Sequence, residues 1–285
     1  MSPSDGGNDA GIRIYEHEFM AMKRCRHGTF LYNVNDPCLG RSLDLYGEWA
    51  ESELRILGQM LRPGDVVLDI GANIGTHTVF FARQVMPQGI VLAFEPQRLI
   101  FQNLCANLAL NGLVNVLALQ KGVGRQAGRV PLPVIDPRQS VNFGNFHLKD
   151  HAHGEVVDVI RIDDLPLTAC KLLKIDVEGM ECDVLEGARQ SIARFRPAML
   201  VENNRAESSP ALIATIESLD YEAYWMICNP AQPDNYFRNP TNAFGDAAEI
   251  NLLCVPRGGQ VQVGGLPKVT GIDDTPQAAL VRKRN

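Results

Sequence analysis

A strand, a glycine turn, a helix and a second strand ending in an acid follow one another in the first third of this chain. Residues Val66–Ile70 are almost wholly apolar, which suits a buried parallel strand. Gly71 and Gly75 bracket a tight turn into a helix, and the next apolar strand ends at Glu95. Glycines let backbone approach a ligand closely, and an acid there can accept two hydrogen bonds from a ribose diol. The pattern predicts a nucleotide site in an α/β fold.

The residues around the turn favour one nucleotide ligand. A dinucleotide fingerprint, G-x-G-x-x-G, has a glycine where this chain has Asn73, and that glycine lets a pyrophosphate sit against backbone. A phosphate loop of the form G-x-x-x-x-G-K-[ST] is also absent from the sequence. Asp69, two residues before Gly71, can bind an ammonium group directly or through water. S-adenosylmethionine has an ammonium group, a ribose diol and no phosphate, so D-x-G-x-x-x-G followed by Glu95 favours this cofactor.

Composition and charge exclude several classes of protein. The chain has 285 residues, enough for one large α/β domain with additions. Its net charge of −6 leaves no basic footprint for nucleic acid, and it contains no run of 18 apolar residues that would span a membrane. The N-terminus lacks a signal sequence, and the seven cysteines are scattered without C-x-x-C pairs. We therefore expect reduced thiols in a cytoplasmic protein without nucleic-acid or membrane partners.

The chain divides into four predicted parts. Residues 1–11 are polar and Gly-rich and are predicted to be a disordered tail. Residues 12–64 are predicted to form short strands and an amphipathic helix over 47–61 that pack on the core. Residues 65–256 are predicted to form the ligand-binding domain, and residues 257–285 a C-terminal tail. Within the domain, strands and helices are expected to alternate over 66–70, 75–86, 90–94, 97–111 and 114–119.

The second half of the domain begins with an insertion. Residues 121–160 are rich in Gly, Pro, Asn and His and are predicted to lie over the active site. The alternation then resumes with a strand over 170–176, a helical stretch through 184–195, a strand over 197–202, a helix over 209–219, and two final strands near 221–227 and 249–255. The predicted fold is a Rossmann-like, doubly wound, mostly parallel sheet with a C-terminal antiparallel hairpin. Ligands in such sheets bind at the carboxyl ends of the strands.

Five segments resemble one family of enzymes. They are LDIGANIG over 68–75, FEP over 94–96, IDDL over 162–165, LKIDVEG over 173–179 and VEN over 201–203. Together they resemble the FkbM family of S-adenosylmethionine-dependent methyltransferases, from about residue 40 to residue 255. The resemblance implies the class I methyltransferase fold and the methyl donor. The family chiefly O-methylates sugars and natural-product hydroxyls and in some cases N-methylates peptide amides, so the expected acceptor is a small molecule or a glycan.

The cofactor site is predicted from the ends of the first four strands. Lys121 and Gly122 follow the third strand, where adenine usually lies in this fold and where backbone amides can contact the ring edge. The fourth strand ends at Asp176. The predicted cofactor-binding residues are Asp69, Gly71, Asn73, Gly75, Thr76, Glu95, Pro96, Lys121, Gly122 and Asp176.

The ends of the fourth and fifth strands supply the candidate catalytic groups. Asp176, Glu202 and Asn203 would form an oxygen-rich set suited to Mg²⁺ or another divalent cation. The set looks like the metal site of catechol-type O-methyltransferases, which typically have Asp where this chain has Glu202. Alternatively, Asp176 and Glu202 orient acceptor hydroxyls or brace the turn at Gly179. Glu178 in that turn can fix loop amides, contact substrate or cap a helix.

Three histidines lie close together in the insertion, at 147, 151 and 153. Histidine is a natural base near neutral pH, and His147 is the predicted catalytic base. Alternatively, His147, His151 and His153 form a metal cluster or a solvent-exposed polar loop.

Other functions remain open from the sequence. The favoured reaction is O-methylation of a sugar or natural-product hydroxyl by in-line displacement, with N-methylation of a peptide amide as the alternative. A nicotinamide oxidoreductase is disfavoured by Asn73 and by the absence of a Tyr-x-x-x-Lys pair. A non-catalytic nucleotide-binding module, or a structural βαβ unit without a ligand, would keep the fold and lack the chemistry. The oligomeric state is not determined by the sequence, and a homodimer is one option.

Overall fold

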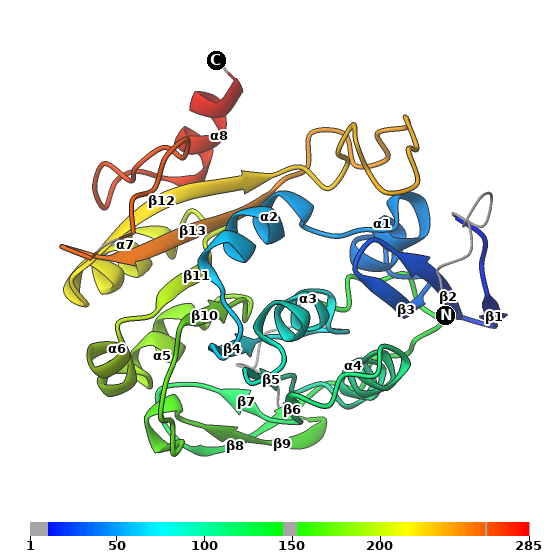
Figure 1. Ribbon diagram of the computed structural model, residues 1–285, viewed down its shortest axis with the longest axis horizontal. Coiled ribbons are helices and arrows are strands. Elements are labelled where there is room, and N and C mark those ends of the chain that lie inside the picture. The colour runs from blue at the N-terminus through cyan, green and yellow to red at the C-terminus, as the bar shows by residue number, and fades with distance from the viewer. Residues whose placement is uncertain (1–10, 145–152, 260, 285) are drawn as a thin grey trace.

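A seven-stranded sheet with helices on both faces forms the centre of the molecule (Figure 1). The computed structural model describes residues 11–144, 153–259 and 261–284. The strands stand in the order β12-β13-β11-β10-β4-β5-β6, and β13 alone runs antiparallel to its neighbours β11 and β12. They are β4 (Val66–Ile70), β5 (Ile90–Phe94), β6 (Val116–Leu119), β10 (Leu172–Ile175), β11 (Ala198–Glu202), β12 (Tyr221–Cys228) and β13 (Glu249–Pro256). This confirms the predicted doubly wound sheet and its C-terminal antiparallel hairpin.

The strand order reverses between β4 and β10. The chain runs outward from β4 through β5 to β6 and then returns to β10, which pairs with the other side of β4. The crossovers on either side of this point leave a crevice at the carboxyl ends of the two strands, where ligands bind in open α/β sheets.

Each face of the sheet has its own core because successive side chains of a strand point to opposite faces. Val67 packs with α2 (Glu51–Met60) and α3 (Thr76–Val85), whereas Leu68 packs with the helices of the other face. Those helices are α5 (Glu181–Glu186), α6 (Arg189–Phe195) and α7 (Ser209–Ser218). Burial on both sides explains why the central strands appear as continuous apolar runs in the sequence.

Two helices replace the single helical stretch predicted through 184–195. The prediction was wrong because the chain turns between α5 and α6 at Gly187. A Cβ atom on Gly187 would lie 2.1 Å from the carbonyl oxygen of Gly124, so the two backbones meet there directly. The contact anchors the turn to the start of the insertion.

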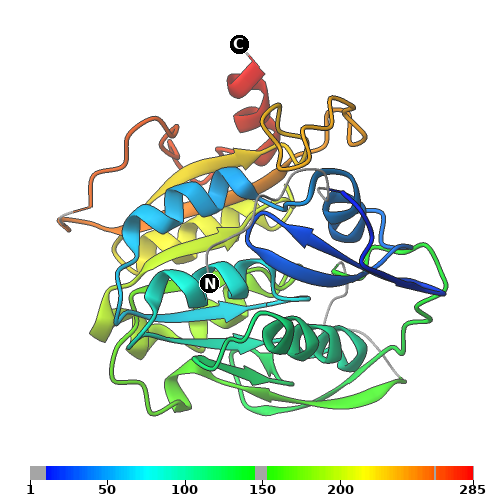
Figure 2. The ribbon, with the colours of Figure 1, turned by 45° about the vertical axis from the view of Figure 1, so that its right-hand side comes forward.

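The N-terminal part contains a helix that the sequence analysis missed. Strands β1 (Tyr15–His17), β2 (Met20–Cys25) and β3 (Gly28–Asn33) are followed by α1 (Leu39–Tyr46). Gly47 ends α1 at φ 68°, and Ala50 precedes α2 at φ 52°, so the helix predicted from residue 47 begins at Glu51. The β2–β3 hairpin lies beside α4 (Arg98–Leu110), as Figure 2 shows in blue and green.

The insertion forms a small separate sheet in the order β7-β9-β8. Its strands are β7 (Gly122–Val123), β8 (Gly128–Leu132) and β9 (Glu155–Ile160), and a 3₁₀ turn, η1 (Ile162–Asp164), leads back to the main sheet. Residues 145–152 lie outside the described residues.

The C-terminal segment packs on the edge of the main sheet and ends in α8 (Pro276–Arg284). Ala279 is 1% exposed and belongs to the core, and the indole Nε1 of Trp225 on β12 donates a hydrogen bond to Asp274, at 3.0 Å. Arg282 donates to the same carboxylate. The described part of the predicted tail is therefore tied to the sheet. Of the predicted disordered tail, only Gly11 lies within the described residues.

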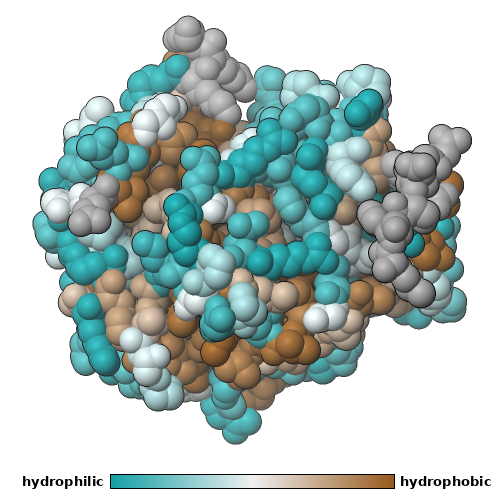
Figure 3. Space-filling model, viewed as in Figure 1, coloured by the Kyte–Doolittle hydropathy of each residue, from teal (hydrophilic) through white to brown (hydrophobic). Residues whose placement is uncertain are grey.

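The hydropathy of the surface and the length of the helices concern the prediction that the chain has no membrane span. Figure 3 shows hydrophilic and hydrophobic side chains interspersed over one face of the molecule. Among the helices of the described ranges, none combines the length and the apolar character that a bilayer crossing requires.

The turn after β4 lies so close to the residue after β10 that no side chain fits between them. Gly71 has φ 77°, and a Cβ atom there would lie 1.7 Å from the backbone oxygen of Asp176. Gly64, in the turn before β4, has φ 95° with nothing within 4 Å of its Cβ position. The two glycines share a left-handed backbone, and Gly71 also requires the absence of a side chain.

We expect Gly71→Ala to destabilise the protein more than Gly64→Ala. Both changes force alanine into a left-handed conformation at a cost of about 1–2 kcal/mol. Gly71→Ala also forces two backbones apart, which adds about 1–3 kcal/mol. Urea unfolding of the two variants measures the difference. Equal losses of unfolding free energy would contradict the close contact between Gly71 and Asp176.

Candidate active site

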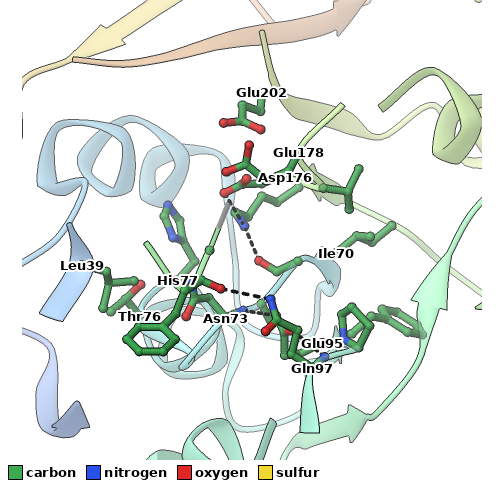
Figure 4. A pocket seen from close by; sticks show the side chains of 18 of the residues that line it. Leu39, Ile70, Asn73, Thr76, His77, Glu95, Gln97, Asp176, Glu178 and Glu202 are labelled. Carbon is green, nitrogen blue, oxygen red and sulfur yellow. Dashed lines mark hydrogen bonds and ion pairs between the residues drawn. The ribbon is translucent and has the colours of Figure 1, made fainter. Parts of the chain in front are cut away.

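A cavity of about 420 Å³ opens at the carboxyl ends of β4, β5, β10 and β11 (Figure 4). That volume is typical of small-molecule sites. The insertion reaches it through Asn142, Phe143 and Gly144, and the N-terminal part through Cys38, Leu39 and Trp49. Eight predicted cofactor residues line it, namely Gly71, Asn73, Thr76, Glu95, Pro96, Lys121, Gly122 and Asp176.

The glycine turn presents backbone to the cavity. Asn73 has φ 50°, and its side-chain oxygen accepts a hydrogen bond from the backbone N–H of Ile74, at 2.8 Å. Gly75, at φ 91°, starts α3 and does not line the cavity. A Cβ atom on Gly75 would lie 2.6 Å from Leu104, so this glycine shapes the turn and its packing on α4.

Glu95 is fixed at the floor of the cavity. It follows β5, and its carboxylate accepts hydrogen bonds from the backbone N–H groups of Asn73, at 3.0 Å, and Gln97, at 2.9 Å. Burial raises the pKa of Glu95 to about 7, against the lowering effect of these two N–H groups. Each carboxylate oxygen keeps further acceptor capacity, so Glu95 can receive two hydrogen bonds from a pair of neighbouring hydroxyls.

Asp69 is not part of the cavity wall. Its side chain is completely buried, accepts a hydrogen bond from the Thr78 hydroxyl at 2.6 Å, and lies 3.3 Å from the Lys174 ammonium nitrogen. We predicted that Asp69 binds an ammonium group of a ligand. In the structure, the ammonium group beside Asp69 is that of Lys174. Asp69 lies within β4, so its side chain is buried in the protein and does not reach the ligand site beyond the end of the strand.

Lys174 lies between the buried Asp69 and Asp176, which lines the cavity. Its Nζ donates a hydrogen bond to the backbone oxygen of Gly71, at 2.9 Å, and lies 3.3 Å from an Asp176 oxygen. Burial alone would lower the pKa of Lys174, but the carboxylates of Asp176 and Asp69 more than offset this and raise it. The lysine therefore remains a cation.

Three carboxylates, Asp176, Glu178 and Glu202, form what we call the acid trio. One oxygen of each lies within 4.8 Å of the others. Glu178, at φ 53°, accepts a hydrogen bond from Arg205 at 2.9 Å. Figure 4 shows the three side chains together above the glycine turn.

Glu202 is the most buried member of the acid trio, at 6% exposed. Its Oε1 accepts a hydrogen bond from Asn204 at 2.5 Å, whereas Oε2 is buried without a hydrogen-bond partner among the described residues. Burial raises the pKa of Glu202 well above its usual range and that of Glu178 to about 7, and the charge of Asp176 adds to both shifts. A bound cation would offset the repulsion between these carboxylates, and a hydroxyl donor would give Oε2 of Glu202 a hydrogen-bond partner.

The structure places Asn203 outside the acid trio. Its amide nitrogen donates to the Ser209 hydroxyl at 2.9 Å, and the side chain does not line the cavity. Successive residues at a strand end point to opposite sides, so Glu202 and Asn203 cannot both face the cavity. Glu178 occupies the place that the sequence analysis assigned to Asn203.

The predicted histidines do not reach the cavity within the described residues. His153 is exposed and does not line it, and His147 and His151 lie outside the described residues. Residues that the sequence analysis did not single out for the site also line the cavity, among them Trp49, His77, Lys174 and Glu249. His77 carried one available signal, since it lies directly after the glycine turn.

The sequence model of the FkbM methyltransferase domain matches residues 69–223, more than half of the chain. The chain belongs to the FkbM methyltransferase domain family. The matched region runs from β4 to the start of β12 and so includes Glu95, Lys174 and the acid trio.

Three methyltransferases from other organisms are similar to part of this chain. Methyltransferase 1 of Beauveria bassiana is 32% identical over 42% of this chain and 57% of its own length. The hexuronic acid methyltransferase AglP of Haloferax volcanii is 27% identical over 53% and 61%. The 31-O-demethyl-FK506 methyltransferase FkbM of Streptomyces tacrolimicus is 30% identical over 47% and 63%. The chain thus spans less than two thirds of these relatives.

A solved structure also aligns with this one. The FkbM methyltransferase of Methylobacillus flagellatus aligns at a TM-score of 0.49 with 22% identity, over 73% of this chain and 48% of that chain.

Glu249, which starts β13, makes the stability of the protein depend on pH. Burial raises its pKa from 4.5 to about 8, and Glu53 and Asp176 add to the shift. The folded protein therefore holds this proton more tightly than the unfolded chain. The resulting stabilisation is complete below about pH 4.5 and is lost as the pH rises to about 8.

We expect Glu249→Gln, which cannot ionise, to reduce the fall in unfolding free energy between about pH 5 and pH 9. Glu217→Gln, on the exposed side of α7, is the matched control and leaves the pH profile unchanged. Urea unfolding at several pH values measures both. A Glu249→Gln profile parallel to that of the wild type would refute this role of Glu249.

Proposed function

We propose that this protein transfers a methyl group from S-adenosylmethionine to a hydroxyl of a sugar or a natural-product intermediate. The observation that carries the proposal is Glu95, a buried carboxylate held by two backbone N–H groups and facing a cavity beside a glycine turn. Membership of the FkbM family supports methyl transfer as the chemistry.

The cavity wall suits the three parts of the donor. The ribose diol would donate its two hydrogen bonds to Glu95. Adenine would lie against Lys121 and Gly122, which follow β6, and the methionine part against the glycine turn near Asp176. Asn73 leaves the turn without the glycine that a pyrophosphate requires, which supports a nucleoside without phosphate.

The acceptor would enter beside the acid trio. In the reaction its hydroxyl oxygen attacks the methyl carbon, the bond from methyl to sulfur breaks, and the electron pair stays on sulfur as S-adenosylhomocysteine forms. Holding oxygen, carbon and sulfur in line supplies on the order of 7–11 kcal/mol at the limit. The relative named as a 31-O-demethyl-FK506 methyltransferase supports an oxygen atom as the acceptor, and the relative named as a hexuronic acid methyltransferase supports a sugar as the acceptor class.

We further propose that the acid trio binds a divalent cation. Mg²⁺ binds oxygen at about 2.0–2.1 Å and Ca²⁺ at about 2.3–2.6 Å, so carboxylate oxygens within 4.8 Å of one another can share one ion. The buried Oε2 of Glu202 lacks a hydrogen-bond partner among the described residues, and a cation would satisfy it. Bound there, the ion would polarise an acceptor hydroxyl.

Binding of S-adenosylhomocysteine tests the donor site. We expect calorimetric titration to give micromolar affinity for the wild type and about 10–100-fold weaker affinity for Glu95→Gln, since a charged acceptor of two hydrogen bonds is lost. Glu217→Gln is again the control. Unchanged affinity in Glu95→Gln, or tight binding of NADH instead, would argue against the assignment.

The same preparation tests the reaction. Tritiated S-adenosylmethionine is supplied with neutral monosaccharide glycosides, hexuronic acids, macrolactone polyols and peptide amides. The proposal expects label on a hydroxyl oxygen, located by NMR of the product. Label on amide nitrogen alone, or donor binding without transfer to any member of the panel, would overturn O-methylation.

Manganese binding tests the cation site. We expect electron paramagnetic resonance of the S-adenosylhomocysteine complex to show bound Mn²⁺, and Glu202→Gln to weaken it at least about tenfold. Glu249→Gln removes an acid from the same cavity wall but not from the acid trio, and should change the affinity less than about twofold. Absence of bound Mn²⁺, or equal effects of the two variants, would show that the carboxylates are not ligands.

A further inference from the structure

A buried histidine lies at the cavity without a role in the contacts described so far. His77 is the second residue of α3 and is 6% exposed. His77 is among the residues that line both the main cavity and a small hollow that shares part of its lining, and Figure 4 shows it beside the glycine turn. Its position directly after the turn sets it next to the proposed methionine part of the donor.

A second buried acid, Glu53, faces this histidine. Glu53 lies in the first turn of α2, is 1% exposed, and has one oxygen 3.5 Å from Nε2 of His77. The other oxygen accepts a hydrogen bond from the Asn251 amide, at 2.6 Å. The ring also packs on Phe81, one helical turn further along, with centroids 5.8 Å apart. Three elements, α2, α3 and β13, thus fix the orientation of the pair.

Ionisable side chains surround the ring. Glu249, Asp176 and Lys174 line the same small hollow. The Lys174 ammonium is taken up by Gly71, Asp69 and Asp176, as described above. When His77 accepts a proton in the reaction, the positive charge would form 3.5 Å from an oxygen of Glu53.

We propose that His77, oriented by Glu53, is the general base that accepts the proton of the acceptor hydroxyl. The proposal rests on the proposed O-methylation. In this proposal the ring proton of His77 sits on Nε2, which lies 3.5 Å from a Glu53 oxygen and is buried without a hydrogen-bond partner among the described residues, and Nδ1 is the nitrogen that takes the proton of the acceptor. As oxygen bonds to the methyl carbon and the methyl–sulfur bond breaks, the O–H bond breaks and its proton passes to Nδ1.

The arrangement follows the division of roles in serine hydrolases, where a carboxylate on the far nitrogen holds the base in the correct tautomer. The 3.5 Å separation is longer than a normal hydrogen bond, and contacts of this kind shorten in the substrate complex. In this proposal His77 takes the role that the sequence analysis predicts for His147, which lies outside the described residues. Glu53 acts through His77 and is a positioning residue.

Nitrogen-15 NMR of histidine-labelled protein tests the proposal without an acceptor. His77→Asn assigns the signals. The probes are S-adenosylhomocysteine and sinefungin, which carries an amine where the donor carries its methylated sulfonium. We expect His77 to carry its proton on Nε2, and its Nδ1 shift to differ between the two complexes because the sinefungin amine reaches Nδ1. A proton on Nδ1, or the same Nδ1 shift in both complexes, would overturn the proposal.

Another histidine–glutamate pair provides the internal control. Nε2 of His27 lies 2.6 Å from Glu51 outside the main cavity, so its signals should be alike in both complexes. Glu53→Gln should change the Nε2 signal of His77 while S-adenosylhomocysteine affinity stays within about twofold, and Glu53→Asp should restore it. An unchanged Nε2 signal in Glu53→Gln would refute the positioning role. Failure of both probes to bind would instead overturn the proposed function itself.

Discussion

The buried Lys174 ammonium is the contact on which the candidate active site depends. It lies 2.9 Å from the backbone oxygen of Gly71 and 3.3 Å from carboxylate oxygens of Asp69 and Asp176. Taking an ion out of water costs several kcal/mol, so the cation and its partners must remain together. Because these partners belong to β4 and β10, the lysine joins the two strand ends where the sheet order reverses. Lys174 therefore contacts both the glycine turn, through Gly71, and the acid trio, through Asp176.

Most of the sheet could be predicted from the sequence because its strands are buried on both faces and give continuous apolar runs. The helix α1 could not, because Leu39 and Leu43 are buried only once the β2–β3 hairpin covers them. The packing of the C-terminal segment depends in the same way on a distant contact, that between Trp225 and Asp274. Local patterns predict an element when its burial is continuous, and they miss one whose burial comes from a distant partner.

The site residues also divide into those that the local sequence predicts and those that depend on distant contacts. The position of Glu95 follows from the strand that it ends, and it lines the cavity as predicted. Strand position alone does not tell which way a side chain points, so Asp69 and Asn203 were expected in the cavity and lie outside it. His77 pairs with Glu53, which lies on another helix and 24 positions earlier in the sequence, and a linear pattern does not reveal such a pair. Tertiary structure brings together the groups that the chemistry requires.

The most direct test of this account is a crystal structure of the S-adenosylhomocysteine complex. The account predicts both ribose hydroxyls on the Glu95 carboxylate, adenine against Lys121 and Gly122, and the sulfur facing Asp176 from the glycine turn. A ligand that binds elsewhere, or a ribose that leaves Glu95 unoccupied, would contradict the central claim that this cavity is a methyl-donor site.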